Sequence, residues 1–533
     1  MNNHSKKIKI SFFVIILLLM ASIAGGSFAM KDSNFFTGKQ VSQTIYYLNY
    51  KLSFAQANNK NLTAAVISIF DNASPTIENN NAKSIPVLLY HGIVPVRDRF
   101  SMTPETFKDQ MFALKRAGYE TITMEDFYDF STGKKDLPDK SFLLTFDDGR
   151  KDSYLGADPL LRALGYNAVM FAVVSDSLQE KSKDSNYYLN KTELHAMINS
   201  GRWEIQSHGK QESHNDKINS GFVQINASGE KGNFLSNLMW LPDYNRLELL
   251  EEYEMRIADE FSVSKKIFQD TFGNPILAFS YPFGDYGQQS INHSSSTQAI
   301  HKQIGVSYKL AFRQIWANDN NYSYNYRNDD LLMAKRIEPA TDWSGEKLIS
   351  YLEEGSAKSL PFTDIFTKNN GWIKTWGELS LSGNALVLGS HASTTGSSTF
   401  LNGTYLWQNY VFKSEVKLMK GQVFSLVARY KNDKNYVICS FSNKSVRVEQ
   451  FLNGERNILS ELKSDFVFIG KNLEVGIGVY DDVVNCYLDG KIAMKGYNLD
   501  QELDHGGIGF KTWDPQVNNS ELTVKKVFVE EIK

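Results

Sequence analysis

Hydrophobic and polar positions follow one pattern between residues 85 and 355. Short apolar runs alternate there with segments whose apolar residues recur every three or four positions. The runs are typical of buried strands, and the longer period is typical of helices. Strands are expected at 86–90, 120–123, 141–146, 167–174, 203–207, 276–281, 307–313 and 331–337, and helices at 104–117, 152–164, 191–200, 246–272 and 296–304. Repeated β–α units predict an α/β fold, a parallel sheet or barrel with sites at the carboxyl ends of the strands.

The pattern changes at about Phe362. Helical periodicity ends, and short alternating strands are expected at 406–418, 422–429, 434–441, 445–451, 473–480, 483–488 and 522–531. Asp489-Gly490 lies between 483–488 and 491–495, which indicates a hairpin. Residues 362–533 are therefore expected to form an all-β sandwich of the jelly-roll kind.

The N-terminus has the pattern of a targeting segment. Lysines precede an apolar run at residues 10–24, and Ser27-Phe28-Ala29 offers small residues for cleavage. Because the run is long for a signal peptide, an uncleaved membrane tether through residues 10–24 is the alternative. Either interpretation of residues 1–29 predicts a secreted or cell-surface, extracytoplasmic protein. Residues 30–84 read as an N-terminal segment and linker.

Composition narrows the partners. The chain has 533 residues and a formal net charge of −3, so no basic excess favours nucleic acid. Its two cysteines, Cys439 and Cys486, lie late in the sequence. Export permits a disulfide between them, but two buried free thiols fit the spacing equally well. The oligomeric state stays open.

Polar residues follow several predicted strands at the point where each ends. His91 follows strand 86–90, Asp147 and Asp148 follow strand 141–146, and His208 follows strand 203–207. In a barrel these groups would converge on one rim. Two adjacent carboxylates beside a buried strand are costly unless they are compensated, and a bound cation would do so.

One carboxylate and two imidazoles suit zinc or a similar divalent ion. We take Asp148, His208 and His214 as the metal ligands. Asp147 is then the base that accepts a proton from water, and His91 protonates a leaving amine. The alternative for any single histidine is a hydrogen-bonded structural role.

Residues 85–355 resemble the polysaccharide deacetylase family, carbohydrate esterase family four. Thr145-Phe146-Asp147-Asp148-Gly149 matches its first motif, which implies that Asp147 is the base and Asp148 a metal ligand. Ser207-His208 with His214 resembles the second motif, whose histidines complete a site for Zn²⁺, or for Co²⁺, Ni²⁺ or Fe²⁺.

Tyr281-Pro282-Phe283-Gly284 resembles the third motif, which walls the substrate groove. The resemblance implies that the backbone N–H of Phe283 faces the oxyanion. It also implies a distorted (β/α) barrel, with metal-dependent N-deacetylation as the activity.

The run Val87 to Ile93 resembles the branch that deacetylates poly-β-1,6-N-acetylglucosamine in biofilms. In that branch the histidine of this motif, here His91, is the acid. The implied partner is an N-acetylglucosamine-containing polysaccharide. Peptidoglycan and chitin oligomers share the acetamide group and remain alternatives.

Departures from the family pattern leave alternatives open. His214 lies farther from His208 than the family spacing, and His195 is an outside candidate. Ser280 stands where many members carry an arginine that tethers the base. Arg336 could supply that charge, or it could form a surface ion pair with Glu338.

Two other functions remain as hypotheses. A decayed metal site would make the chain a glycan-binding adhesin, and the third hypothesis is a structural wall protein.

Tryptophans are candidates for sugar contacts. Trp240 ends an insertion at 215–245 and could stack on a sugar or anchor the loop. The run Gly506 to Trp513 resembles concanavalin-like sandwich modules, which often bind glycans. The candidate platforms there are Trp372, Trp376, Trp407 and Trp513, with core packing as their alternative.

Overall fold

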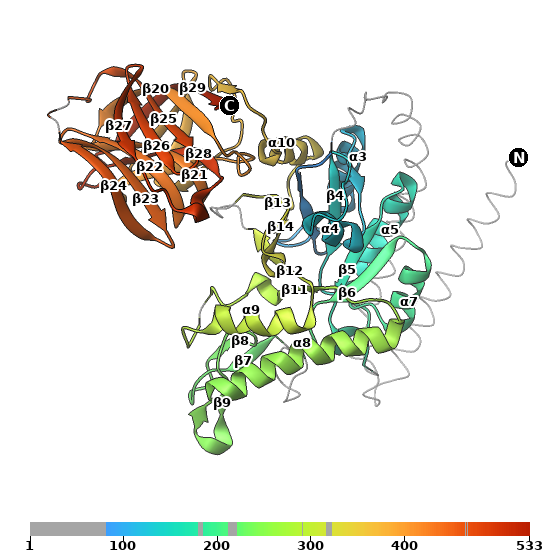
Figure 1. Ribbon diagram of the computed structural model, residues 1–533. Helices are drawn as coiled ribbons and strands as arrows, with labels where there is room; N and C mark the ends of the chain where they lie inside the picture. The colour runs from blue at the N-terminus through green and yellow to red at the C-terminus, as the bar shows by residue number, and fades with distance from the viewer. Residues whose placement is uncertain are drawn as a thin grey trace, which may run out of the picture. The chain divides into compact units, whose positions relative to one another are not determined.

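Seven parallel strands close into a barrel in the computed structural model (Figure 1). The structure describes residues 81–179, 185–211, 221–289, 291–315, 322–463, 465 and 467–532. The ring runs from β2 through β4, β5, β6, β11, β12 and β14 and returns to β2. The predicted barrel is therefore confirmed. Its strands are β2 (Val87–Tyr90), β4 (Ser141–Phe146), β5 (Ala168–Ala172), β6 (Trp203–Ser207), β11 (Ala278–Ser280), β12 (Leu310–Ile315) and β14 (Ala334–Ile337); β3 (Glu120–Thr121) pairs with β4 outside the ring.

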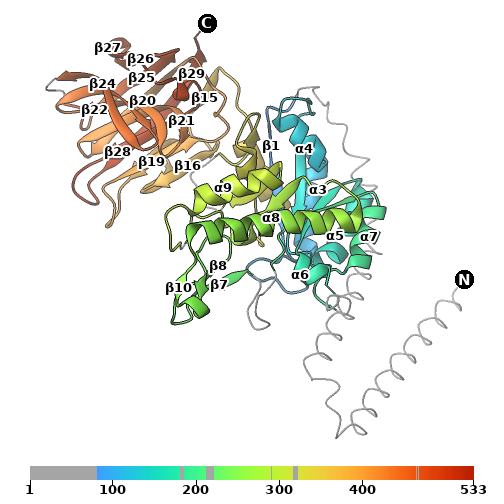
Figure 2. The ribbon, with the colours of Figure 1, turned by 60° about the horizontal axis from the view of Figure 1, so that its bottom comes forward.

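Helices connect the strands, and α8 and α9 lie side by side (Figure 2). The first of them, α3, begins at Pro104, where the Thr103 side chain accepts the Thr106 N–H. The long helix begins at Leu250 rather than at 246, because residues 246–247 pair with a neighbouring strand. The helices are α3 (Pro104–Arg116), α4 (Met124–Ser131), α5 (Lys151–Leu164), α6 (Val174–Ser177), α7 (Lys191–Asn199), α8 (Leu250–Phe272), α9 (Ser296–Ser307) and α10 (Gly345–Gly355).

Short strand pairs and 3₁₀ turns accompany the barrel. β1 (Ser84–Ile85) pairs with β13 (Asn325–Tyr326), β7 (Phe222–Gln224) with β8 (Lys231–Asn233), and β9 (Trp240–Leu241) with β10 (Arg246–Leu247). The 3₁₀ turns are η2 (Pro242–Tyr244), η3 (Pro282–Gly284), η4 (Leu331–Met333) and, later in the chain, η5 (Gln501–Leu503).

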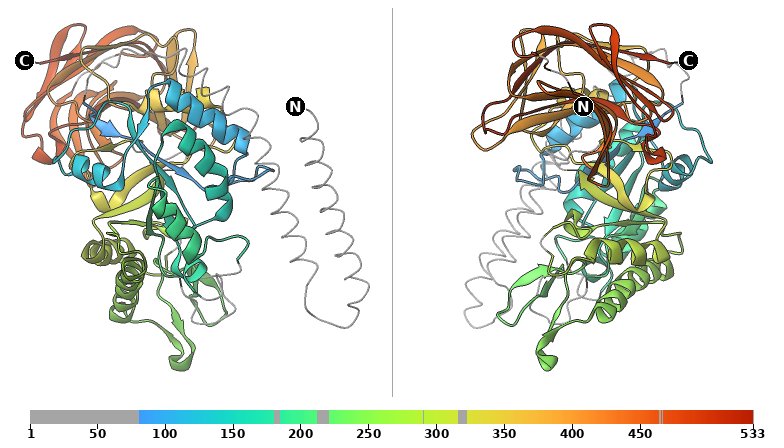
Figure 3. Two further views of the ribbon diagram at one scale, coloured as in Figure 1. Left: turned by 90° about the vertical axis from the view of Figure 1, so that its right-hand side faces the viewer. Right: turned by 60° about the vertical axis from the view of Figure 1, so that its left-hand side comes forward.

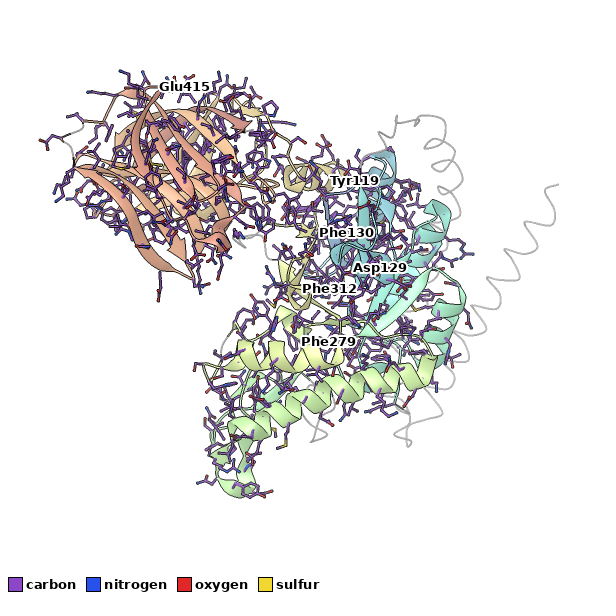
Figure 4. The ribbon with its side chains drawn as sticks, viewed as in Figure 1. Tyr119, Asp129, Phe130, Phe279, Phe312 and Glu415 are labelled. Atoms are coloured by element: carbon purple, nitrogen blue, oxygen red, sulfur yellow. A yellow bond between two sulfur atoms is a disulfide. The ribbon has the colours of Figure 1, made fainter. Side chains whose placement is uncertain are left out.

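Alternate strand residues fill the barrel interior. Phe312 of β12 points inward and packs on Phe127 of α4, whereas Phe279 of the neighbouring strand β11 packs outward on Phe261 of α8 (Figure 4). Phe130, also of α4, joins the interior cluster. The strand residues of this cluster lie mostly in the first half of each strand. Helix α4 therefore covers the amino ends of the strands, and the carboxyl ends stay open at the opposite end of the barrel.

The C-terminal part is a sandwich of two antiparallel sheets (Figure 3). The Asp489-Gly490 hairpin is confirmed, with both residues at positive φ, 49° and 74°. The eight-stranded sheet contains β17 (Glu378–Ser382), β18 (Ala385–Gly389), β29 (Glu521–Glu531), β20 (Tyr410–Lys420), β25 (Asn472–Tyr480), β26 (Val483–Leu488) and β27 (Lys491–Gly496), with β15 (Phe362–Asp364) on β29. The seven-stranded sheet contains β16 (Trp372–Trp376), β19 (Gly396–Leu401), β28 (Gly507–Trp513), β21 (Val423–Asn432), β22 (Asn435–Ser442), β23 (Ser445–Leu452) and β24 (Glu455–Lys463).

A disulfide joins the two sheets of the sandwich. Cys439 of β22 bonds to Cys486 of β26, and both residues are fully buried in the core between the sheets. The pairing that the sequence left open is thereby decided. The bond crosses from one sheet to the other, so it ties together strands that share no ladder hydrogen bonds.

The targeting segment and most of the linker lie outside the described residues. Within the described residues no helix is both long and apolar enough to cross a membrane. Barrel strands fall between Val87 and Ile337 and sandwich strands between Phe362 and Glu531. The domain boundaries at 85, 355 and 362 stay predictions.

Removing the disulfide should destabilise the sandwich. The bond closes a loop of 47 residues. In the chain-entropy view we expect the double variant Cys439→Ala/Cys486→Ala to lose about 4 kcal/mol of unfolding free energy. Denaturant unfolding of both proteins, with and without a reductant, measures this loss. The reductant should destabilise only the parent protein; equal midpoints for parent and variant would contradict the expectation.

Candidate active site

The site is centred on a buried ion pair between Asp147 and Arg336. The two side chains are 3% and 0% exposed. Arg336 donates from Nη1 to Oδ1 at 2.6 Å and from Nη2 to Oδ2 at 2.7 Å, which is bidentate geometry. Ser280 completes a triangle: its hydroxyl accepts from Arg336 Nη2 at 2.6 Å and donates to Asp147 Oδ2 at 3.0 Å.

Arg336 decides the charge of Asp147. Burial alone would raise the pKa of Asp147, but the guanidinium of Arg336, assisted by His208, outweighs it and lowers that pKa. Asp147 is therefore ionised at neutral pH and able to accept a proton. The sequence left two partners open for Arg336, namely Asp147 and Glu338. In the structure Arg336 pairs with Asp147 and not with Glu338.

The period of the strands explains how these residues meet. Successive strand residues point to opposite faces. Asp147 therefore points inward like Leu143, which lies four residues earlier. By the same count Arg336 follows inward-facing Ala334, and Ser280 follows inward-facing Ala278. Three strands, β4, β11 and β14, therefore send a polar group into the same layer near the carboxyl end of the barrel.

Asp148 turns away from its neighbour because the backbone reverses there. It adopts φ 71°, a left-handed conformation, and Gly149 follows at φ 65°. The Asp148 carboxylate is about one third exposed and lies 3.5 Å, Oδ1 to Nε2, from His208. Burial would raise the pKa of Asp148, but His208 and His91 lower it overall, so this carboxylate is ionised as well.

His208 has the orientation that a metal ligand needs. Its Nδ1 lies 3.0 Å from the carbonyl oxygen of Ser280, and a proton on Nδ1 leaves the lone pair of Nε2 facing Asp148. Asp148 and His208 therefore fit two positions of a divalent-metal site. His214, the third predicted ligand, lies outside the described residues. Among the residues that are described, no group of three or more His, Cys, Asp or Glu side chains could hold a metal ion.

His195 takes no part in this group. It lies in α7 with its ring 4.9 Å from the ring of Phe272, in an edge-to-face contact. That packing agrees with a structural role for His195.

His91 faces a carboxylate of its own. Its Nδ1 lies 2.9 Å from Oε1 of Glu338, and both side chains are largely buried. Burial alone would lower the pKa of His91, but Glu338, Asp148 and Asp147 together raise it. The protonated form is favoured, as an acid requires.

Glu338 is the functional candidate that sequence reasoning missed in this role. It comes two residues after Arg336 at the end of β14. The inward phase of Ala334 and Arg336 continues to Glu338, so strand periodicity was the available signal.

The third motif forms a turn after β11. Tyr281 is buried and donates from its hydroxyl to the carbonyl of Leu332, while Pro282 and Gly284 are buried beside it. Phe283 has φ 60°, and its half-exposed ring packs on Phe222 at 4.9 Å between centroids. The backbone hydrogen bonds of the turn are donated by Gly284 and Asp285, so within the described residues the Phe283 N–H has no acceptor.

Trp240 is not brought to this group by any contact in the described part of the chain. It lies half-buried on β9, opposite Leu247 of β10. Its part in the substrate groove stays a prediction.

Comparisons with known proteins identify the barrel. Residues 134–301 match the family described as polysaccharide deacetylase. This segment contains Asp147, Asp148, His208 and the third motif, whereas His91 and Arg336 lie outside it. The Bacillus subtilis protein YxkH, named for polysaccharide deacetylase activity, is 24% identical over 44% of this chain and 69% of its own length.

Two further relatives are named poly-β-1,6-N-acetyl-D-glucosamine N-deacetylase. That of Escherichia coli K12 is 26% identical over 35% of this chain and 28% of its own length. That of Staphylococcus aureus MRSA252 is 21% identical over 42% of this chain and 66% of its own length. A solved de-N-acetylase from Aggregatibacter actinomycetemcomitans is 22% identical, covers 50% of this chain and 98% of its own, and has a TM-score of 0.40.

The barrel is thus a hydrolase domain that acts on carbon–nitrogen bonds. The match at residues 134–301 makes this a polysaccharide deacetylase domain.

Removing the arginine should expose how much the buried pair contributes. In Arg336→Met the carboxylate of Asp147 stays buried without a partner, so we expect a loss of about 3–5 kcal/mol of unfolding free energy at pH 7. Ser280→Ala removes only one hydroxyl and should cost about 1 kcal/mol. Denaturant unfolding of the two variants measures both losses. If Arg336→Met lost no more unfolding free energy than Ser280→Ala, the buried pair would not be a major source of stability.

Proposed function

We propose that this chain is an exported, metal-dependent N-deacetylase. It hydrolyses the acetamide groups of N-acetylglucosamine units in a surface or biofilm polysaccharide, with poly-β-1,6-N-acetylglucosamine as the favoured polymer. The observation that carries the proposal is the carboxylate of Asp147, tethered by Arg336, within one group of side chains that also holds Asp148, His208 and His91 paired with Glu338.

The metal would be held by Asp148 and His208, with His214 as the proposed third ligand. Zn²⁺ suits this set of donors best, and Co²⁺, Ni²⁺ or Fe²⁺ are the other candidates. When bound, a divalent ion supplies Lewis-acid polarisation of the acetamide carbonyl and lowers the pKa of water.

The chain's own groups carry the protons. Asp147 accepts a proton from the attacking water, whose oxygen forms a bond to the acetamide carbon. The Phe283 N–H donates a hydrogen bond to the oxyanion that develops on the former carbonyl oxygen. His91 donates its Nε2 proton to the amine nitrogen, the carbon–nitrogen bond breaks, and acetate and a glucosamine unit result. Glu338, 2.9 Å from Nδ1, keeps the His91 ring oriented and favours its protonated form before this proton is given up.

The alternative of a decayed site receives no support from the geometry. In a decayed site the tether of the base would be free to loosen, whereas Asp147 keeps both arginine contacts and the Ser280 hydroxyl. The polymer rests on the names of relatives that match only part of each chain, so peptidoglycan and chitin oligomers remain as competing substrates.

Acetate release tests the activity. The protein from residue 30 onward, loaded with Zn²⁺, should release acetate from β-1,6-linked N-acetylglucosamine oligomers faster than from chitin oligomers or peptidoglycan. Chelation should abolish the release, and added Zn²⁺ or Co²⁺ should restore it. Asp147→Asn should lower the rate by about 10²–10⁴-fold, because it removes the proton acceptor. If the metal-loaded protein released no acetate from any of the three substrates, the proposed class of polymer would be wrong.

The pH profile tests the acid. Since His91 must be protonated, activity should fall as pH rises through its raised pKa. In Glu338→Gln the charge that raises this pKa is lost, so the alkaline limb should move to lower pH. Glu338→Asp, which keeps the charge, should move it less. An alkaline limb that stays in place in Glu338→Gln would contradict the role given to the His91–Glu338 pair.

A further inference from the structure

A groove of about 680 Å³ lies on the seven-stranded sheet of the sandwich, on the face turned away from the core. It is separate from the deacetylase site in sequence and in the residues that line it. One wall carries two tryptophans, Trp376 and Trp513, which are 40% and 44% exposed. Large exposed aromatic surfaces grouped in a groove mark a ligand site more often than chance packing.

An irregularity in β16 brings Trp376 to this face. Trp372, four residues earlier in the same strand, points into the core and is 2% exposed. Regular alternation would send Trp376 to the core as well. The register shifts between Lys374 and Trp376, and the extra residue, Thr375, reverses the phase of the strand.

The two rings flank one glycine. Gly396 of β19 pairs with Trp513 of β28, and a Cβ at Gly396 would overlap the backbone carbonyl oxygen of Thr512 and come within 2.9 Å of the Trp376 ring. A larger residue at this position would displace the ring. The glycine therefore permits both the close approach of the Thr512 backbone and the position of the Trp376 ring beside the strand that carries Trp513.

The floor of the groove is made of short hydroxyl side chains. Ser398, Ser425 and Ser440 belong to three strands and, with Lys511 between the first two, form one directly paired row across the sheet. Ser425 and Ser440 share a hydrogen bond of 2.9 Å. Small hydroxyl groups leave space and offer both donors and acceptors, which fits a ligand that is rich in hydroxyl groups.

The charged side chains that line the groove nearly balance one another, because Asp433 and Glu449 stand beside Arg447, Arg456 and Lys511, and this balance suits an uncharged ligand. Arg447 pairs with Glu461 and Arg456 pairs with Glu449, so these guanidiniums are already neutralised. Lys511 has no carboxylate within ion-pair distance among the described residues. Its ammonium donates to the hydroxyl of Tyr436 at 2.6 Å and keeps two further protons for a ligand.

We propose that this groove binds a neutral, N-acetylated sugar chain. Trp376 and Trp513 stack on the C–H faces of sugar rings, the serine row contacts hydroxyl groups, and Lys511 donates to an acetamide or hydroxyl oxygen. The choice of polymer rests on the proposed deacetylase function, whereas the groove itself does not. A deacetylated unit seated against Lys511 would bring its ammonium group against that of the lysine, so we expect acetylated units to be preferred at this position.

Binding to the full chain tests this site. The parent for the test carries Asp147→Asn, so that the oligomers stay intact during titration. Calorimetry should show that it binds acetylated β-1,6-N-acetylglucosamine oligomers at least tenfold more tightly than the same oligomers after chemical deacetylation. Adding Trp376→Ala and Trp513→Ala should weaken binding of the acetylated oligomers at least tenfold.

Two control variants separate the groove from general surface effects. Tyr480→Ala removes an aromatic side chain of similar exposure, 44%, from the other sheet and should leave the affinity unchanged. Lys511→Met should reduce the preference for acetylated over deacetylated oligomers. Unchanged affinity in the tryptophan variant, or equal affinity for both oligomers in the parent, would overturn the proposal.

The two proposals fail in different ways. With Asp147 restored, the tryptophan variant should still release acetate from short soluble oligomers at the parental kcat if the barrel acts as proposed. Loss of acetate release in every protein while oligomer binding persists would remove the deacetylase proposal alone.

Discussion

The buried ion pair between Asp147 and Arg336 is the constraint on which the rest of the site depends. A charge with 3% exposure or less is tolerated only when its partner is held in good geometry. The barrel supplies that geometry from strands on different sides of the ring. Ser280 extends the arrangement, because its hydroxyl joins the pair while its carbonyl oxygen faces Nδ1 of His208. Ser280 thus helps to fix the orientation of both Asp147 and His208.

A second ion pair in the same site has the opposite chemical result. Arg336 lowers the pKa of Asp147, whereas Glu338 and its acidic neighbours raise the pKa of His91. The ionised form of a carboxylate and the protonated form of an imidazole are therefore both favoured within one group of side chains. Separating the pKa values of two titratable groups in this way is how a single site holds a base and an acid ready at the same pH. Both partners, Arg336 and Glu338, come from the end of β14.

Strand periodicity made most of the barrel predictable. The strands at 86–90, 141–146 and 203–207 were found within a residue, and the groups that follow them do converge. Arg336 remained one of two alternatives, because choosing between them requires knowing which strands are neighbours across the ring. The helices α4 and α10 were not expected from the pattern. The reversal of Trp376 depends on a single extra residue, Thr375, which no alternation pattern can signal.

The left-handed turn at Asp148 has a consequence for how such a site can be copied or altered. Asp147 and Asp148 are chemically identical, and only the backbone between them sends one inward to Arg336 and the other toward His208. The backbone conformation, and not the chemistry of the side chains, therefore makes their environments different. Two aspartates placed at the end of another strand would therefore not point to two different partners unless Gly149 and the left-handed turn were transferred with them.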